Sequence, residues 1–493
     1  MNGRTLDERR RTKDEIRAVC HLPREAVIRH SSREAVLRHG IVFLTILGLL
    51  LPIAPSSAQG TDDRVERILA AMSVEQRVGQ LFMVDFVGAD AKPDSAIAHL
   101  IHDYHVGAVY LTWLNGNITN ETGTPAQVAR LTNSLQQLAC DDTRLPNVAD
   151  CVPLFVAVDH EGDGYPRTHL RQGATQIPSA MAIGATWSED DAQRVGEVVG
   201  RELSAVGVNM LLGPVVDVLE RPHPEGGGDL NLRVFGGDPT WVGMWGRAYI
   251  RGVHQGSGGR MLTVAKHFPG HGSSDRNPDQ EVSTVSKSLD DLKRGDLVPF
   301  FAVTEAGSDK GMTDALMPSH IRYRGFQGDV SQLTKPISLD PEGMGAFMSL
   351  PQLAEWRRGG LVVADALGVP ALQSYYDPTL STFPARQAAK DALLAGNDVL
   401  PIVLYARERD YNGKQLPNML DTMAYFRDEY RANPVFRQRA DDAVRHILSA
   451  KLRLYPNLSP QSTQVDAAQV STVVGQGDAA MRGVIQDALT VIS

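Results

Sequence analysis

Charged and imidazole side chains follow four apolar runs of this 493-residue chain. The run at 153–158 is followed by DHEGD (159–163), and the run at 262–265 by KHFPGHG (266–272). His320 and Asp365 end two further runs. Burying charge beside an apolar segment is costly unless something needs it there. Because the pattern recurs at the same point of each run, it favours one shared polar pocket over separate structural ion pairs.

Asp365 follows four apolar residues and precedes an Ala-Leu-Gly turn. A carboxylate at a strand end is held rigidly, and rigid placement suits a nucleophile that attacks a carbon centre. The alternative is an aspartate that caps a helix N-terminus. Lys266 and His267 are neighbours, which in a strand normally point to opposite faces. Ahead of a Pro-Gly turn both can line one pocket and donate hydrogen bonds to hydroxyl groups; a Lys–Asp pair and a packed core histidine are the alternative.

The strands and helices expected to position these residues alternate regularly along the sequence. Short apolar runs alternate with amphipathic helical stretches, and such runs are expected of parallel strands buried on both faces. The eight runs lie at 81–86, 107–113, 153–159, 208–214, 262–268, 315–320, 360–365 and 396–402. The alternation predicts the α/β class and a (β/α)8 TIM barrel with loop insertions. The rival is an open doubly wound sheet, whose glycine-rich phosphate loops have no counterpart here.

Three regions are expected: a leader and signal or anchor segment at 1–58, the barrel at 59–456, and a tail or linker at 457–493. An apolar run at 41–53 follows basic residues and precedes small ones, as in a secretory signal. It is short for a membrane span, although an uncleaved anchor is the alternative. We therefore expect an exported protein, periplasmic, extracellular or membrane-anchored.

The cysteines indicate the redox compartment, and the net charge bears on the kinds of partner. Cys140 and Cys151 flank a short polar segment, and in an oxidising compartment they would form a local disulfide; two free thiols are the alternative. Cys20 lies in the leader. The net charge of −9 argues against nucleic acid as a partner, and against a membrane partner other than through an N-terminal anchor.

In order and in combination, seven motifs over residues 65–455 resemble glycoside hydrolase family 3. The motifs are VAVDHEGDGYPR (156–167), GPVVDV (213–218), RVFGGDP (233–239), VAKHFPGHG (264–272), MPSHI (317–321), VVADALG (362–368) and AGNDVL (395–400). The Pro-Gly-His-Gly form is similar to the β-N-acetylhexosaminidase branch.

The resemblance implies a retaining two-step hydrolysis of a β-linked carbohydrate without metal or organic cofactor. It makes Asp365 the nucleophile. Side chains that match or adjoin the sugar-binding positions are Asp159, Arg167, Arg233, Lys266, His267 and His320. Carboxylates accept from sugar hydroxyls, and the cations donate to hydroxyls or to an N-acyl group.

The general acid departs from the family pattern. The family branch carries an Asp-x-His pair after His-Gly, whereas this chain has Asn277-Pro278-Asp279 there and no histidine between His271 and His320. Asp279, Asp275 and Glu281 are candidates in the same loop, because a carboxylic acid with a raised pKa can do this work. Asp163, where the family usually has glycine, is a smaller departure.

The leading interpretation is an exo-acting β-N-acetylglucosaminidase that removes a terminal, non-reducing sugar. A β-glucosidase or β-xylosidase of the same family is the first alternative. A non-catalytic sugar-binding barrel without its general acid is the second.

Overall fold

The computed structural model describes residues 57–142, 145, 151–162, 166–220, 230–274, 276–307, 309–379 and 381–489. Most of the predicted leader therefore lies outside the described residues, as do Asp163 and the candidate acid Asp275.

Eight short parallel strands form one sheet in the order β10-β1-β2-β3-β4-β5-β7-β9. Its two end strands meet at a parallel bridge between Val363 and Val399, so the sheet closes on itself. The strands are β1 (Phe82–Val84), β2 (Ala108–Tyr110), β3 (Phe155–Val158), β4 (Met210–Leu211), β5 (Leu262–Phe268), β7 (Ala315–Pro318), β9 (Leu361–Val362) and β10 (Leu400–Pro401). Each of the eight predicted apolar runs contains one strand, which confirms the barrel.

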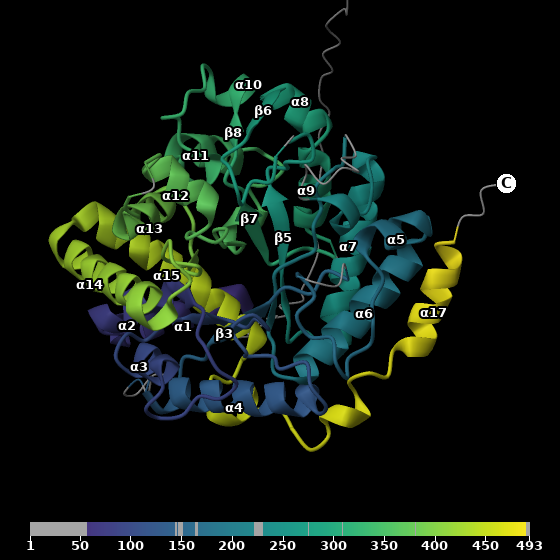
Figure 1. Cartoon of the computed structure of the whole chain (residues 1–493), viewed down its shortest axis with the longest axis horizontal. Coiled ribbons are helices and arrows are strands. Elements are labelled where there is room, and N and C mark those ends of the chain that lie inside the picture. Colours follow the sequence, from purple (N-terminus) through teal and green to yellow (C-terminus); the bar gives the residue numbers. More distant parts are fainter. Residues whose placement is uncertain are drawn as a thin grey trace, which may run out of the picture. The chain divides into compact units, whose positions relative to one another are not determined.

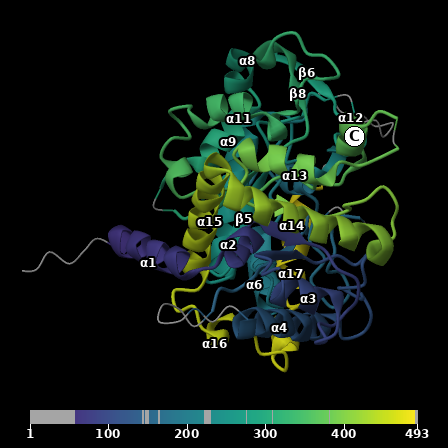
Figure 2. The same ribbon diagram turned by 90° about the vertical axis from the view of Figure 1, so that its left-hand side faces the viewer.

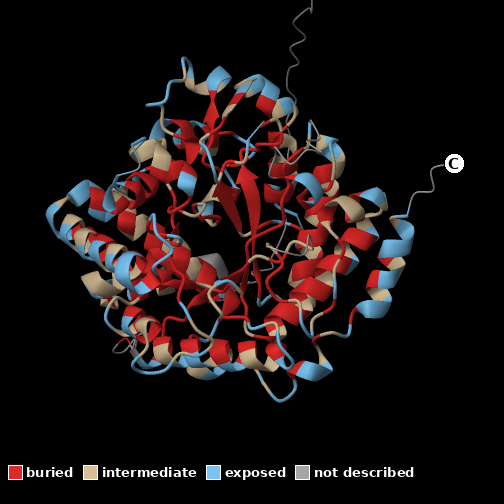
Figure 3. Ribbon diagram, in the orientation of Figure 1, coloured by how far each residue is buried: buried red, intermediate tan, exposed pale blue. Residues whose placement is uncertain are grey.

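Helices surround the strands (Figure 1). They are α1 (Ser57–Ala71), α2 (Val74–Gln80), α3 (Ala96–His102), α4 (Thr124–Asp142), α5 (Ala180–Ala185), α6 (Glu189–Ala205), α7 (Pro239–Gly256), α8 (Leu289–Arg294), α9 (Leu297–Thr304), α10 (Arg324–Gln327), α11 (Pro341–Met348), α12 (Pro370–Tyr376), α13 (Ala385–Leu394), α14 (Leu416–Ala432), α15 (Pro434–Leu454), α16 (Pro460–Thr463) and α17 (Asp478–Asp487). The strands at the centre are buried, whereas the outer faces of the helices are exposed (Figure 3).

The sequence explains where these helices begin. Ser188 caps α6 by accepting a hydrogen bond from the backbone of Asp191, and three acidic residues in its first turn favour the positive end of the helix dipole. Ser73 and Gln76 form the capping box that the sequence predicts for α2. The inner faces of α6 and α7 carry small and β-branched residues, and several of their glycines lie directly against the neighbouring helix backbone.

Two short strands stand outside the barrel and were not predicted. β6 (Thr284–Ser288) and β8 (Arg322–Tyr323) pair in parallel, with Thr284 opposite Arg322. They belong to the insertions that follow β5 and β7. Among the described residues, no helix is both long and apolar enough for a membrane crossing.

Both ends of the described chain pack on the barrel. Helix α1 lies beside α15 (Figure 2), where Glu66 pairs with Arg445 at 2.6 Å. The tail after α15 runs past α4 and ends with α17 beside α6. Val470, Val474 and Met481 of the tail are buried. The described part of the tail is therefore a strap that packs on the barrel; whether it also serves as a linker stays a prediction.

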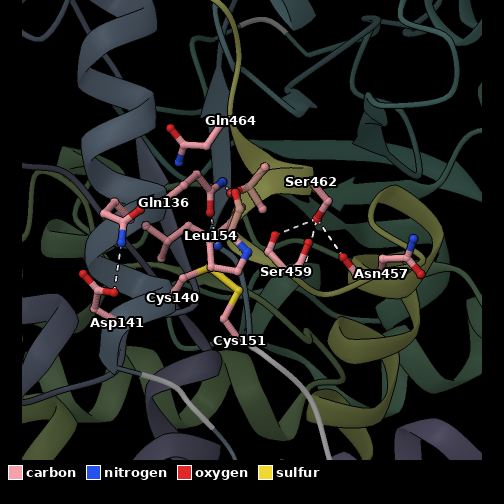
Figure 4. The surroundings of a disulfide bond; sticks show 12 residues. Gln136, Cys140, Asp141, Cys151, Leu154, Asn457, Ser459, Ser462 and Gln464 are labelled. Atoms are coloured by element: carbon pink, nitrogen blue, oxygen red, sulfur yellow. Dashed lines mark hydrogen bonds between the residues drawn. A yellow bond between two sulfur atoms is a disulfide. The ribbon is translucent and has the colours of Figure 1, made fainter.

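The predicted disulfide joins Cys140 and Cys151 (Figure 4). Cys140 lies near the end of α4, and Cys151 leads into β3. The backbone amide of Cys151 donates to the carbonyl of Leu458 at 3.1 Å, so the bridged segment also holds the first residues of the strap. Both sulfur-bearing residues are fully buried.

Candidate active site

A buried array of charges links three segments at the carboxyl ends of the strands. The ammonium of Lys266, on β5, lies 2.7 Å from Asp159 Oδ1 and 2.7 Å from Glu161 Oε1, both in the segment after β3. The guanidinium of Arg233, in the short helix η1 (Asn231–Arg233), donates to both Glu161 oxygens, at 2.6 and 3.0 Å. The structure thus brings together three predicted site residues, Asp159, Arg233 and Lys266, around Glu161.

These groups keep one another charged. Burial alone would raise the pKa of Glu161, but Arg233 and Lys266 hold it well below its usual range. Burial alone would lower the pKa of Lys266, but Asp159 and Glu161 raise it instead. Burial alone would raise the pKa of Asp159, but favourable interactions, chiefly the charge and hydrogen bond of Lys266, lower it. The array therefore offers fixed carboxylates as acceptors and fixed cations as donors.

Asp159 has two further neighbours. The hydroxyl of Tyr110, at the end of β2, donates to Asp159 Oδ2 at 2.6 Å and lies 3.0 Å from His169 Nε2. Because the tyrosine hydroxyl gives its proton to Asp159, Nε2 of His169 donates to the tyrosine oxygen. Burial lowers the pKa of His169. The carboxylate of Asp159 is therefore fixed from two sides, by Lys266 and by Tyr110.

His267 belongs to a second, neighbouring cluster. Its Nδ1 lies 2.8 Å from Asp217 Oδ2 and 3.1 Å from His271 Nε2. Burial alone would raise the pKa of Asp217, but the two histidines and the backbone amide of His271 keep it far below its usual value. Among the described residues, this cluster has ligand-type atoms close enough together to hold a cation, and hydrogen bonds already join those side-chain atoms.

The peptide bond between Lys266 and His267 is cis. Lys266 faces Asp159, whereas His267 faces Asp217, so the two side chains join adjacent networks at one end of the barrel. Both the Lys–Asp pair and the buried histidine that the sequence left open as an alternative are present. A sugar-binding role for either residue is compatible with this geometry and stays a prediction.

Asp365 follows β9 and is half-buried. Its Oδ1 accepts a hydrogen bond from the backbone amide of Ala366 at 2.8 Å. The next helix, α12, begins only at Pro370 with Val369 as its cap, so Asp365 does not cap a helix. The carboxylate is held at a strand end, where a barrel enzyme carries its catalytic groups.

His320 fixes the backbone beside Asp365. Its Nε2 lies 3.1 Å from the carbonyl of Ala366, and its Nδ1 lies 2.7 Å from the hydroxyl of Ser338. Burial lowers the pKa of His320 although the charge of Asp365 opposes this shift, so the neutral ring donates from Nε2 and accepts from Ser338. This contact makes His320 a positioning residue; its predicted contact with sugar stays a prediction.

The loop that holds the candidate acids reaches the segment after Asp365. Asp279 is half-buried, and its backbone carbonyl accepts from the amide of Ala371 in α12 at 3.0 Å. Glu281 is exposed and pairs with Arg276. Arg167 is half-buried and directly precedes Thr168, which forms a bridge with His160 beside the Asp159 array.

Sequence reasoning missed the partners that hold the predicted groups. Glu161 lies in the DHEGD motif. Its position two residues after Asp159 places both carboxylates after the same strand, which is the feature that could have identified it. Asp217 lay in the GPVVDV motif without a role. Tyr110 gave no signal, because only the pairing of β2 with β3 places it beside Asp159.

The comparisons with known proteins agree with this architecture. The family model described as the glycosyl hydrolase family 3 N terminal domain matches residues 73–450. A β-hexosaminidase A from Pseudoalteromonas piscicida is 27% identical over 421 residues, which cover 82% of this chain and 64% of that protein. A β-N-acetylglucosaminidase/β-glucosidase from Cellulomonas fimi is 28% identical over 396 residues, which cover 79% of this chain and 59% of that protein.

Solved structures show the same fold. A family 3 β-N-acetylglucosaminidase from Paenibacillus sp. strain FPU-7 superposes with a TM-score of 0.67 at 25% identity, covering 85% of this chain and 70% of that chain. A β-N-acetylhexosaminidase from Beutenbergia cavernae gives 0.59 at 27% identity, covering 77% of this chain and 98% of that chain. This chain spans less than two thirds of the two relatives from Pseudoalteromonas and Cellulomonas. Because the family model matches more than half of its residues, the chain belongs to the glycosyl hydrolase family 3 N-terminal domain family.

Proposed function

We propose that the protein is a retaining, exo-acting β-glycosidase that removes terminal N-acetylglucosamine from β-linked glycans. The observation that carries the proposal is the buried array of Asp159, Glu161, Arg233 and Lys266, which lies at the same carboxyl-terminal end of the barrel as Asp365. Fixed donors and acceptors hold a pyranose by its hydroxyls, and a rigid carboxylate then attacks the anomeric carbon.

The proposed reaction has two steps. Asp365 attacks the anomeric carbon and forms a glycosyl–enzyme ester, while a general acid gives a proton to the departing oxygen. Water then attacks the anomeric carbon of this intermediate and releases the carboxylate of Asp365, while the conjugate base of the same general acid takes a proton from that water. Asp279 is the preferred acid because its loop reaches α12, which begins five residues after Asp365.

A panel of aryl β-glycosides of N-acetylglucosamine, glucose and xylose tests the sugar preference. We expect the N-acetylglucosaminide to give the highest kcat/KM, with a product of retained configuration in a proton NMR time course. The Cellulomonas relative carries both enzyme names, so a β-glucosidase is the second candidate. Preference for the glucoside would favour it, and no turnover of any glycoside would favour a binding barrel.

We further propose that the protein is exported. Two observations support this: the apolar run at 41–53 followed by small residues, and the buried Cys140–Cys151 disulfide, which persists in oxidising compartments. Fractionation of cells that express the full chain, with mass analysis of its N-terminus, tests the proposal. A full-length protein in the cytoplasmic fraction with reduced cysteines would contradict it.

A further inference from the structure

Three of the five tryptophans of the chain meet at the surface between α6 and α7. Trp187 precedes α6 and is 65% exposed, whereas Trp245 of α7 is 3% exposed. The ring of Trp187 meets those of Trp241 and Trp245 edge-on, with centroids 5.5 and 5.7 Å away. Trp241 and Trp245 stack on each other at 5.4 Å. Trp241 and Trp245 thus support the exposed ring of Trp187 from beneath.

Trp187 also has an unfavourable backbone conformation. Its φ angle is 55°, in the left-handed region that bulky residues rarely adopt. Asparagine or glycine would fit this position without strain. Its edge-on contacts with Trp241 and Trp245 leave most of the indole exposed, so packing alone does not account for the strain, and strained residues concentrate at functional sites.

The cluster lies on the same side of the barrel as the candidate active site. Trp187 and Trp241 stand at the N-termini of α6 and α7, and in this barrel each helix begins on the side where the preceding strand ends. Trp241 follows Arg233 by eight residues, and α5 contacts the segment between them: Gly184 lies so close to the carbonyl of Phe235 that a Cβ would not fit. The aromatic cluster and the charged array are therefore linked by one short segment of chain on the same side of the barrel.

The surroundings of the ring indicate the kind of ligand. Asp190, Asp238 and Thr240 are exposed on the two adjoining helix starts. Carboxylates and hydroxyls accept hydrogen bonds from sugar hydroxyls. The acidic side chains disfavour an anionic ligand, and the indole face suits the C–H face of a β-linked pyranose.

We propose that Trp187, supported by Trp241 and Trp245, is a stacking platform for a neutral β-glycan outside the catalytic pocket. This inference rests on the proposed function, because it assigns the enzyme a polymeric substrate whose chain contacts the barrel beyond the terminal sugar. Under this proposal, an aryl glycoside fills only the catalytic pocket, whereas a longer oligosaccharide also contacts Trp187.

The test compares Trp187→Asn with Trp187→Phe. Asparagine removes the ring and relieves the left-handed strain, so the variant should fold, and phenylalanine keeps an aromatic face. Val435→Ala, at an exposed apolar residue of α15, is the matched control. Binding of chitohexaose and of soluble glycol chitin is measured by calorimetry and affinity electrophoresis, with hydrolysis of the aryl N-acetylglucosaminide measured in parallel.

Trp187→Asn should weaken chitohexaose binding roughly three- to ten-fold, the size of one aromatic contact. Trp187→Phe should retain most of the affinity, and aryl glycoside hydrolysis should change less than about two-fold in all three variants. Unchanged glycan binding by Trp187→Asn would overturn the platform, even with full activity. Ring-dependent glycan binding without hydrolysis of any glycoside would refute only the proposed function. Loss of self-association in Trp187→Asn, with glycan binding intact, would identify the surface as a protein interface and overturn the proposal.

Discussion

The guanidinium of Arg233 donates two hydrogen bonds to the carboxylate of Glu161, and each of these side chains is only 5% exposed. Lys266 adds a second cation to the same carboxylate at 2.7 Å. A buried ion pair of this kind contributes little net stability when complete, because desolvation offsets the attraction, but removing one partner leaves an uncompensated buried charge. The array therefore couples the stability of the barrel to the geometry of the proposed sugar site.

Arg233→Met is expected to destabilise the protein by about 3–5 kcal/mol, the usual cost of removing one partner of a buried pair. Arg233→Lys keeps the charge but loses the two-point geometry, so it should cost less stability. Urea denaturation at pH 7 measures both values. If Arg233→Met were as stable as the wild type, the pair would not be buried as described.

The carboxylate of Asp365 is the proposed nucleophile. Asp365→Ala should lower kcat for an activated aryl glycoside at least about 10³-fold, as expected when covalent catalysis is lost. Added azide should restore part of the rate and give a product of inverted configuration, because a small anion fits the space left by the carboxylate. A trapping 2-fluoro sugar should label the wild type at Asp365 alone. Activity that persisted in Asp365→Ala would exclude this role.

The general acid is tested by the leaving group. Asp279→Asn should lower kcat/KM roughly 10²- to 10⁴-fold for a poor leaving group and much less for dinitrophenol, which departs without a proton. The pH profile of Asp279→Asn should keep the acidic limb of the wild-type profile and lose its basic limb, which reports the protonated general acid. Asp275→Asn, in the same loop but outside the described residues, is the comparison. If neither substitution changed the profile, the acid would come from elsewhere.

The barrel was predictable because strands buried on both faces appear in the sequence as apolar runs. The run at 262–268 coincides with β5, whereas β9 and β10 occupy only two residues of their runs. The β6–β8 pair was not predictable, because TVSKS has polar side chains and the residues that pair are 38 positions apart.

The site was predictable only in part, because the sequence shows local features but not contacts between distant segments. Charged residues at strand ends are visible locally, so Asp159, Lys266 and Asp365 could be selected. Which cation faces which carboxylate depends on side-chain geometry between segments distant in the sequence. Glu161 was therefore not recognised as the centre of the array.

The disulfide should stabilise both the barrel and its strap. Cys140 and Cys151 are 11 residues apart, and closing a loop of this length contributes about 2–3 kcal/mol in the chain-entropy model. Replacing both by alanine should lower the free energy of unfolding by about this amount. It should also speed proteolysis after residue 457, because Cys151 holds Leu458. Reductant should lower the Tm of the wild type and leave that of the variant unchanged; equal responses would contradict the disulfide.

Asp85 should make stability depend on pH in an unusual direction. It follows β1 and is 4% exposed; Oδ2 accepts from Asn115 at 3.0 Å, whereas Oδ1 has no hydrogen-bond partner among the described residues. Burial raises its pKa to about 6. Between its unfolded pKa, near 3.9, and 6, the folded state holds a proton that the unfolded state releases. The contribution of Asp85 to stability is therefore lost as the pH rises through this window.

Asp85→Asn keeps the shape and cannot ionise, so it should match the wild type at pH 4 and exceed it by roughly 2–3 kcal/mol at pH 7.5. Urea unfolding curves at half-unit intervals of pH measure the difference. Asp90→Asn, at an exposed aspartate in the following loop, controls for the loss of one negative charge. A constant difference between pH 4 and pH 7.5 would show that Asp85 titrates normally in the folded protein. Because Asp85 lies close enough to Tyr110 for its charge to raise the pKa of that hydroxyl, a confirmed shift would also mean that the charge beside the Asp159 array changes near pH 6.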